Sequence, residues 1–179
     1  MMLYHGSHEI IARIDLSKCR SRTDFGKGFY LADKIGTAQA WAARKAELIG
    51  GTPTILRYEI GSDLYRLYGK RFENAPSFDW LDFISTNRHR NADNASKKEP
   101  VHDYNWVSGP IADDRIADVV DEYLTGDVSA TEAIRRARIL PQTYQLSIHT
   151  PDAIRAIDDE NVGYKQFKNG RWTKDWRER

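Results

Sequence analysis

Hydrophobic and polar residues alternate in two segments of the chain, residues 55–60 and 143–149. In each segment the large apolar side chains fall on every second position, which places them on one face of an extended chain. We therefore predict a half-buried strand at each of the two segments. Shorter apolar runs predict further strands at residues 3–7, 28–32 and 104–111.

Other segments carry hydrophobic residues at the spacing of a helix. The clearest runs from Ile116 to Leu124, where apolar residues recur at i, i+3, i+4, i+7 and i+8. A capping-box sequence at 129–132 predicts the start of the next helix, which ends at Pro141. A further helix is predicted after residue 32, where it carries Trp41 and ends at Gly50. Another is predicted at residues 77–84, followed by a polar loop at 86–99. The last is predicted from Pro151 through Ile157.

Strands and helices follow one another without a regular βαβ alternation, which favours an α+β fold over a doubly wound sheet. The chain has 179 residues, 30% of them charged and 40% hydrophobic, and its formal net charge is +1. These values are typical of a globular protein and give no electrostatic argument for nucleic acid or a membrane surface as a partner. We expect a single domain over residues 1–165, followed by a basic and aromatic tail at 166–179 that is either packed or loose.

Several classes of site and location are disfavoured by residues that the chain lacks. Cys19 is the only cysteine, so no disulfide can form within the chain and a reducing, cytoplasmic compartment is expected. No apolar run approaches the ~20 residues of a membrane span, and the first residues lack a secretion signal, so we expect no membrane association. The histidines show no ligand spacing, so no metal site is predicted. There is no Walker loop and no nucleophile elbow, and no helix directly follows Gly26 and Gly28, as a dinucleotide fingerprint requires.

Two residues in the predicted strands are candidates for ligand binding, His5 and Tyr30. His5 is followed by Gly6, a residue type that lets a ligand approach the backbone closely. Tyr30 follows a Gly-Lys-Gly stretch, and its ring has the shape to stack on a flat heterocycle. Each residue alone also suits the core, His5 as a hydrogen-bonded buried histidine and Tyr30 as a packed aromatic.

The stretches LYHGS (3–7) and TDFGKGFYLAD (23–33) together resemble the nicotinamide-binding half of the ADP-ribosyltransferase superfamily. The resemblance is to the histidine–tyrosine branch, which contains diphtheria-type toxins and poly(ADP-ribose) polymerases. Over residues 3–157 the chain is also similar to a group of bacterial ADP-ribosyltransferase-like proteins. The shared features are a helix with Trp41, the segment 107–114 and the strand 145–150.

The resemblance implies an ADP-ribosyltransferase fold, in which two small antiparallel sheets form a cleft for NAD and helices flank them. It implies transfer of ADP-ribose from NAD to a protein or a nucleic acid without a metal, and a similarity to toxins that a cognate antitoxin protein neutralises. His5 would bind a ribose hydroxyl, the Gly6 backbone the nicotinamide carboxamide, and Tyr30 the nicotinamide ring. The NAD-binding set implied is His5, Gly6, Ser7, Arg20, Gly26, Lys27, Gly28 and Tyr30, with Arg20, Arg22 and Lys27 at the pyrophosphate or, alternatively, on a solvated face.

The best-known members of the superfamily carry a glutamate on a late strand, and this chain offers Gln145 in the matching strand. An amide can accept the same hydrogen bond from ribose, but it brings no negative charge against the cation that forms when nicotinamide leaves. Asp113 and Asp114 are expected either to supply that charge or to cap the following helix. The predicted catalytic set is therefore His5, Tyr30, Asp113, Asp114 and Gln145.

Two other functions stay open on the sequence. Because Gln145 is neutral, the chain is also compatible with a module that binds NAD or ADP-ribose without transferring it. An RNA 2′-phosphotransferase, which belongs to the same superfamily, would need several arginines around a phosphate, and no such set stands out.

Overall fold

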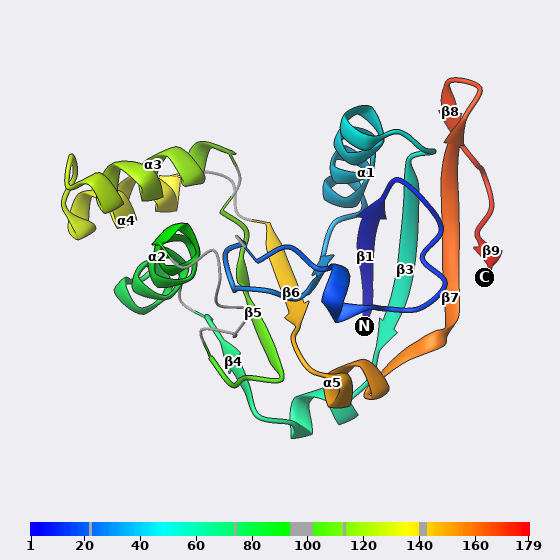
Figure 1. Ribbon diagram of the computed structural model, residues 1–179, viewed down its shortest axis with the longest axis horizontal. Coiled ribbons are helices and arrows are strands. Elements are labelled where there is room, and N and C mark those ends of the chain that lie inside the picture. The colour runs from blue at the N-terminus through cyan, green and yellow to red at the C-terminus, as the bar shows by residue number, and fades with distance from the viewer. Residues whose placement is uncertain (22, 74, 94–101, 113, 140–142) are drawn as a thin grey trace.

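A computed structural model of the chain describes residues 1–21, 23–73, 75–93, 102–112, 114–139 and 143–179 (Figure 1). The strands are β1 Met2–Ser7, β2 Phe29–Ala32, β3 Thr54–Ile60, β4 Gly69–Arg71, β5 Trp106–Pro110, β6 Tyr144–Ile148, β7 Ile157–Lys168, β8 Arg171–Trp172 and β9 Arg177–Glu178. The α-helices are α1 Ile35–Ile49, α2 Phe78–Asp93, α3 Asp114–Thr125, α4 Ala130–Ile139 and α5 Pro151–Arg155.

The strands form one mixed sheet in the order β4-β5-β6-β2-β1-β3-β7-β8, with β9 paired to β7. Neighbouring strands are antiparallel except β4 and β5, which run parallel. Antiparallel strands combined with helices confirm the predicted α+β class.

The two separate sheets implied by the resemblance are joined into one sheet here. β2 makes the connection because both of its edges are paired: Ala32 opposes Tyr4 of β1, and residues 29–32 oppose 145–148 of β6. The two ends of the sheet nevertheless carry different helices. α1 lies beside β1 and β3, whereas α2, α3 and α4 gather beside β4 and β5 (Figure 1).

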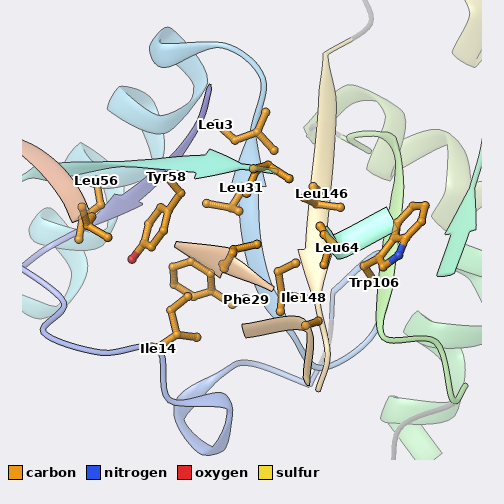
Figure 2. Close-up of a cluster of buried hydrophobic side chains, with 14 residues drawn as sticks. Leu3, Ile14, Phe29, Leu31, Leu56, Tyr58, Leu64, Trp106, Leu146 and Ile148 are labelled. Carbon is orange, nitrogen blue, oxygen red and sulfur yellow. The ribbon is translucent and has the colours of Figure 1, made fainter. Parts of the chain in front are cut away.

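Two apolar clusters follow this division of the sheet. The first is built on β1, β2, β3 and β6, where Leu31, Leu56 and Ile148 are fully buried (Figure 2). It takes Leu56, Tyr58 and Ile60 from the first alternating segment and Leu146 and Ile148 from the second. The second segment is not half-buried as predicted, because Gln145 and Ser147 on its polar face are buried and Tyr144 is 39% exposed. The second cluster lies among α2, α3, α4 and β5, around Trp80 and Ile116. The strands β2 and β6, which carry the residues singled out above, run between the two clusters.

The helix α2 is longer than the sequence predicted, which corrects the polar loop expected at 86–99. Residues 86–93 continue the helix, and residues 94–99 lie outside the described part of the chain. Two polar side chains of this last part are used inside the protein. Asn87 is buried and donates to Phe83 O at 2.9 Å, and Arg88 forms an ion pair with Asp24. The polar pattern resembled a loop because the partner of Arg88 lies far away in the sequence.

The C-terminal segment is packed against the sheet. α5 ends at Arg155, and Ile157, predicted to be helical, begins β7 instead. β8 and β9 both pair back on β7. The ring of Trp176 lies 4.6 Å from the guanidinium carbon of Arg57 and 5.1 Å from the ammonium of Lys165. Among the described helices, none is both long and apolar enough to cross a bilayer.

Candidate functional site

The sheet opens between β1 and β2, next to the residues that the sequence singled out. Tyr4 and Ala32 form the only register pair of these two strands, and Gly6 and Tyr30, which come next in the described ladder, are not paired. The side chain of His5 takes the place of a backbone partner, because its Nδ1 lies 2.7 Å from Tyr30 O. A carbonyl oxygen only accepts, so Nδ1 donates and Nε2 is an acceptor.

His5 is uncharged in this position. Its side chain is buried and stacks on Phe29, with ring centroids 4.2 Å apart. Burial, and then the charge of Lys45, lower the pKa of His5 to about 3. A neutral ring of this tautomer can accept a hydrogen bond from a hydroxyl at Nε2, but it cannot serve as a general acid at neutral pH.

Lys45 closes the opening from the side of α1. Its Nζ donates to Gly6 O at 2.7 Å and lies 3.3 Å from His5 Nε2. Burial, and then the charge of Arg20, lower the pKa of Lys45 to about 8. The sequence analysis missed this residue, although it lies two helical turns after the buried Ala38 and hence on the face of α1 toward β1. We refer to His5, Gly6 and Lys45 as the β1 wall.

Gly6 allows α1 to lie directly against β1. A Cβ at this position would sit 2.2 Å from Ala38 O and 2.8 Å from Ala42 N, far inside van der Waals contact. The close approach that the sequence analysis attributed to a ligand is therefore made here by a helix. The Cβ of Trp41 lies 3.0 Å from the same point, and Trp41 is 42% exposed.

The hydroxyl of Tyr30 is engaged by the turn that precedes its strand. It donates to Gly26 O at 2.7 Å, accepts from Phe25 N at 2.9 Å, and lies 2.9 Å from Thr23 Oγ1. Gly26 has a φ of +81°, a conformation that residues with a side chain rarely adopt. Burial raises the pKa of Tyr30 well above its ordinary value. The partly exposed ring, rather than the hydroxyl, is thus the part of Tyr30 that a ligand can contact.

His149 holds the Gly-Lys-Gly stretch against β6. Its Nδ1 donates to Lys27 O at 2.9 Å, and its Nε2 accepts from the Ser147 hydroxyl at 2.7 Å. A Cβ on Gly28 would lie 2.7 Å from His149 Nδ1, so the glycine makes room for this contact. Burial, and then the neighbouring His102, lower the pKa of His149 to about 4. The ring is a neutral structural link at the edge of the candidate site.

Two of the remaining residues of the implied NAD-binding set lie near the β1 wall: Ser7 follows Gly6 on β1, and the charge of Arg20 lowers the pKa of Lys45. Ser7 is buried at the end of β1, where its Oγ accepts from Glu9 N at 3.3 Å. Arg20 is exposed, and Arg22 lies outside the described residues. A pyrophosphate site at these arginines and Lys27 stays a prediction.

Gln145 is held by a buried carboxylate. It lies on β6 opposite Ala32, and its Nε2 donates to Asp24 Oδ2 at 2.9 Å. The same oxygen accepts from Ala112 N at 3.0 Å, while Asp24 Oδ1 accepts from Arg88 Nη2 at 2.7 Å. Both Asp24 and Gln145 are buried. We refer to Asp24, Arg88 and Gln145 as the β6 wall.

The carboxylate described next to Gln145 belongs to Asp24 and not to the two aspartates that the sequence analysis proposed. Asp113 lies outside the described residues. Asp114 is the first residue of α3 and its side chain is not described, so both roles expected of it stay predictions. Asp24 lies within the stretch TDFGKGFYLAD (23–33). A single polar residue in a turn gives no sequence pattern that points to a partner on a distant strand.

The register of the strands places Gly6, Tyr30 and Gln145 on one face of the sheet. Gln145 opposes Ala32, and Tyr30 lies two residues before Ala32, so both point to the same side. Tyr4 also opposes Ala32, which puts Gly6 on that side as well. Gly6 and Gln145 therefore flank Tyr30 on the adjacent strands β1, β2 and β6, whereas the ring of His5 lies on the other face of the sheet, against Phe29.

The profile of one protein family, described as a protein of unknown function (DUF3990), matches residues 1–158. The chain belongs to the DUF3990 family. Every residue of the β1 wall and the β6 wall lies in the matched range, whereas β8 and β9 lie beyond it. No curated protein and no solved structure matches the chain.

Two features elsewhere in the described structure bear on other kinds of site. Within the described residues no group of three or more His, Cys, Asp or Glu side chains is placed to hold a metal ion. Two surface grooves, one between α1 and the β7–β8 hairpin and one on α3 and α4, contain no residue of either wall.

Proposed function

We propose that this chain is an ADP-ribosyltransferase that transfers ADP-ribose from NAD to a protein or nucleic-acid acceptor. The observation that supports this most is the open ladder between Gly6 and Tyr30, beside a neutral histidine and on the same face as Gln145. A carboxamide offers an N–H donor and a carbonyl acceptor, the same groups as a strand residue. Nicotinamide therefore suits a place where one strand residue lacks its partner.

Each residue receives a role that its surroundings allow. The exposed part of the Tyr30 ring stacks on nicotinamide, since its hydroxyl is engaged by the turn. Gly6 O accepts from the carboxamide, and His5 Nε2 accepts from a ribose hydroxyl. Lys45 contacts both acceptors in the structure, so it must withdraw as NAD enters. NAD would therefore bind by replacing the Lys45 ammonium as the donor to Gly6 O and His5 Nε2, rather than by filling an empty cleft.

The chemical step follows from holding NAD in this way. The bond between ribose and nicotinamide breaks, its electron pair passes to the nicotinamide nitrogen, and nicotinamide leaves uncharged. The ribose carbon becomes an oxocarbenium-like centre, which a nucleophile of the acceptor attacks with loss of its proton. Gln145 accepts from a ribose hydroxyl and fixes the ring, and orientation of this kind contributes to rate. Because Gln145 is neutral, we expect a slow enzyme.

The biological setting is proposed on the sequence resemblance alone. We propose a toxin of a bacterial toxin–antitoxin pair, acting in the cytoplasm and neutralised by an antitoxin protein. No metal is required by the roles given above.

The proposal is tested by incubating the purified protein with labelled NAD and a cell lysate. We expect label in a macromolecule and released nicotinamide from the wild type, loss of both in Tyr30→Ala, and a strong decrease of both in Gln145→Ala. Gln166→Ala is the matched control, because Gln166 is a partly buried strand glutamine whose side chain bonds to Thr54, away from both walls. A wild type that does not bind NAD contradicts the proposal.

A second function is favoured by the neutral Gln145 and by the contacts of Lys45. Both features suit a module that binds NAD or ADP-ribose without breaking it. The same assay separates the two functions: the module binds NAD and loses affinity in Tyr30→Ala, but it releases no nicotinamide with any acceptor. Calorimetry of NAD binding supplies the affinity for this comparison.

A further inference from the structure

Asp24 is the most heavily engaged carboxylate in the candidate site. Its two oxygens receive donors from three different parts of the chain: the side chain of Gln145 on β6, the backbone of Ala112, and the guanidinium of Arg88 on α2. Arg88 reaches Oδ1 through Nη2 at 2.7 Å and through Nε at 3.2 Å. The side chain of Asp24 is 10% exposed, so these donors replace most of its water.

The contact with Asp24 fixes which end of the Gln145 amide faces the substrate. An ionised carboxylate only accepts hydrogen bonds, so the NH₂ group of Gln145 must point toward Asp24 Oδ2 and the carbonyl oxygen must point elsewhere. Turning the amide over would set its oxygen against a carboxylate oxygen at 2.9 Å and forfeit a charge-assisted bond, which is about twice as strong as a neutral one. The carbonyl oxygen of Gln145 is therefore held on the side away from Asp24.

The role of Asp24 is orientation more than charge. Arg88 lies at hydrogen-bond distance from the carboxylate, and its side chain is only 20% exposed, so the pair carries little net charge toward the ribose. A glutamate in place of Gln145 would bring a second carboxylate to within about 3 Å of Asp24, an arrangement in which two groups cannot both stay ionised. Asp24 thus accounts for an amide at a position where the resemblance leads one to expect a glutamate.

We propose that Asp24 is a positioning residue that locks the Gln145 amide with its oxygen toward the ribose hydroxyl of NAD. The inference rests on the proposed function, because it assigns Gln145 to the ribose. It makes Asp24 necessary for turnover without any contact between Asp24 and NAD.

A double-mutant cycle tests this role. The wild type, Asp24→Asn, Gln145→Ala and the double variant are compared for NAD affinity and for the kcat of nicotinamide release, at a temperature where all four are folded. Asp24→Asn is expected to lower kcat about tenfold or more, equivalent to about 1.4 kcal/mol, because its NH₂ can face Gln145 and release the amide from one orientation. In the Gln145→Ala background the same change should have almost no effect on kcat.

The matched control is Asp33→Asn. Asp33 bonds to the backbone of Tyr144, one residue before Gln145 on the same strand, without touching the Gln145 side chain. This variant should keep the wild-type kcat. Equal losses from Asp24→Asn in both backgrounds would mean that Asp24 only supports the fold, and this outcome overturns the inference while the proposed function stands. If the wild type neither binds nor cleaves NAD, both fail.

A stability measurement keeps the contact itself testable if Asp24→Asn does not fold. Gln145→Glu is expected to be less stable than the wild type at pH 7 and to recover part of the loss as the pH falls toward 5, because one of the two facing carboxyls takes up a proton. Gln166→Glu should show no such recovery. A Gln145→Glu variant that is as stable as the wild type at pH 7 shows that Asp24 does not face the amide.

Discussion

The β1 wall and the β6 wall lie on either side of strand β2, which carries Tyr30, but they are held together in different ways. On the β1 wall, one long side chain, Lys45, supplies the donor for Gly6 O and the contact with His5 Nε2. On the β6 wall, Asp24 gathers a side-chain amide, a backbone amide and a guanidinium from separate elements. Withdrawing one lysine opens the first wall, whereas the second cannot change without breaking several bonds at once.

This difference separates two tasks of the candidate site. At the β1 wall a ligand can enter when its own hydrogen-bond donors replace the flexible Lys45 side chain. At the β6 wall the ligand can be oriented, because the side chains there are held in place. We infer that the β1 wall governs admission and affinity and that the β6 wall governs the geometry of the reacting ribose. Substitutions that damage one wall should therefore leave a different signature from those that damage the other.

The largest effect is expected from Gly6→Ala, which breaks the contact between the β1 wall and α1. The new Cβ would lie 2.2 Å from a backbone oxygen of Ala38, so the helix must move, at a cost of about 3 kcal/mol or more. Denaturant unfolding followed by circular dichroism measures the loss. Gly36→Ala on α1 is the control, since nothing lies near its Cβ and alanine favours a helix. A Gly6→Ala loss below about 1 kcal/mol would show that α1 is not seated on Gly6.

Next in size is Arg88→Met, which breaks the β6 wall by leaving Asp24 without its cation. Removal of one partner of a buried pair costs about 3–5 kcal/mol, and we expect about 2 kcal/mol here because Arg88 is partly exposed. Unfolding in urea gives the value. Lys70→Met removes the partner of Asp79, whose side chain is 67% exposed, and should cost less than about 1 kcal/mol. Similar losses in both variants would mean that the β6 wall is no more rigid than a surface pair.

Acid should weaken the β1 wall through His5. Its pKa of about 3 in the folded protein lies below the ordinary 6.5, so the unfolded chain binds a proton that the folded chain rejects. The His5 contribution is complete above pH 6.5 and falls by about 1.4 kcal/mol per pH unit as the pH drops toward 3. The expected loss at pH 5 is about 2 kcal/mol.

The variant His5→Gln separates this effect from other titrations. A glutamine can still donate to Tyr30 O but takes up no proton, so the stability of the variant should depend less on pH between 6.5 and 4, by about one proton. His149→Gln should reduce the pH dependence of the stability by a comparable amount, because the pKa of His149 is also lowered, to about 4. An unchanged slope in His5→Gln would place the acid sensitivity elsewhere.

The smallest effect is expected from Lys45→Ala, which opens the β1 wall. The variant frees Gly6 O and His5 Nε2, so nicotinamide and NAD should bind about three- to tenfold more tightly at pH 7, a gain of about 1 kcal/mol. Calorimetry measures the affinity, and the exposed Lys18→Ala is the control. Weaker binding in Lys45→Ala would mean that Lys45 contributes to the ligand site rather than competing for it.

The parts of the structure that the sequence predicted are those determined by residues close together in the chain. The strand of Gln145 followed from alternation and the strands of His5 and Tyr30 from short apolar runs, while the turn before Tyr30 followed from its glycines. Lys45 was within reach of the same reasoning, because helical spacing aims it at β1. The hydrogen bonds that join His5 to Tyr30 and Asp24 to Gln145 did not follow from any local pattern.

What the sequence did not predict depends on partners far apart in the chain. Asp24 and Gln145 are separated by 121 positions, and Asp24 and Arg88 by 64. A partly buried arginine with such a partner has the same sequence pattern as a solvated one, which is why the end of α2 resembled a loop. The joining of the sheet at β2 is equally non-local, because only the register with β6 reveals it.

The position of β6 in the sheet also has a consequence for the order in which the protein acquires its activity. β6 is made long after β2 and β5, yet it must be inserted between them. Pairing across such a separation loses loop-closure entropy before any stabilising contact forms, so we expect β6 to insert late in folding. A nascent chain that has not yet released β6 from the ribosome already carries His5, Tyr30 and Lys45 but has no Gln145. Under the proposed function, transfer therefore begins only after β6 has left the ribosome and paired between β2 and β5.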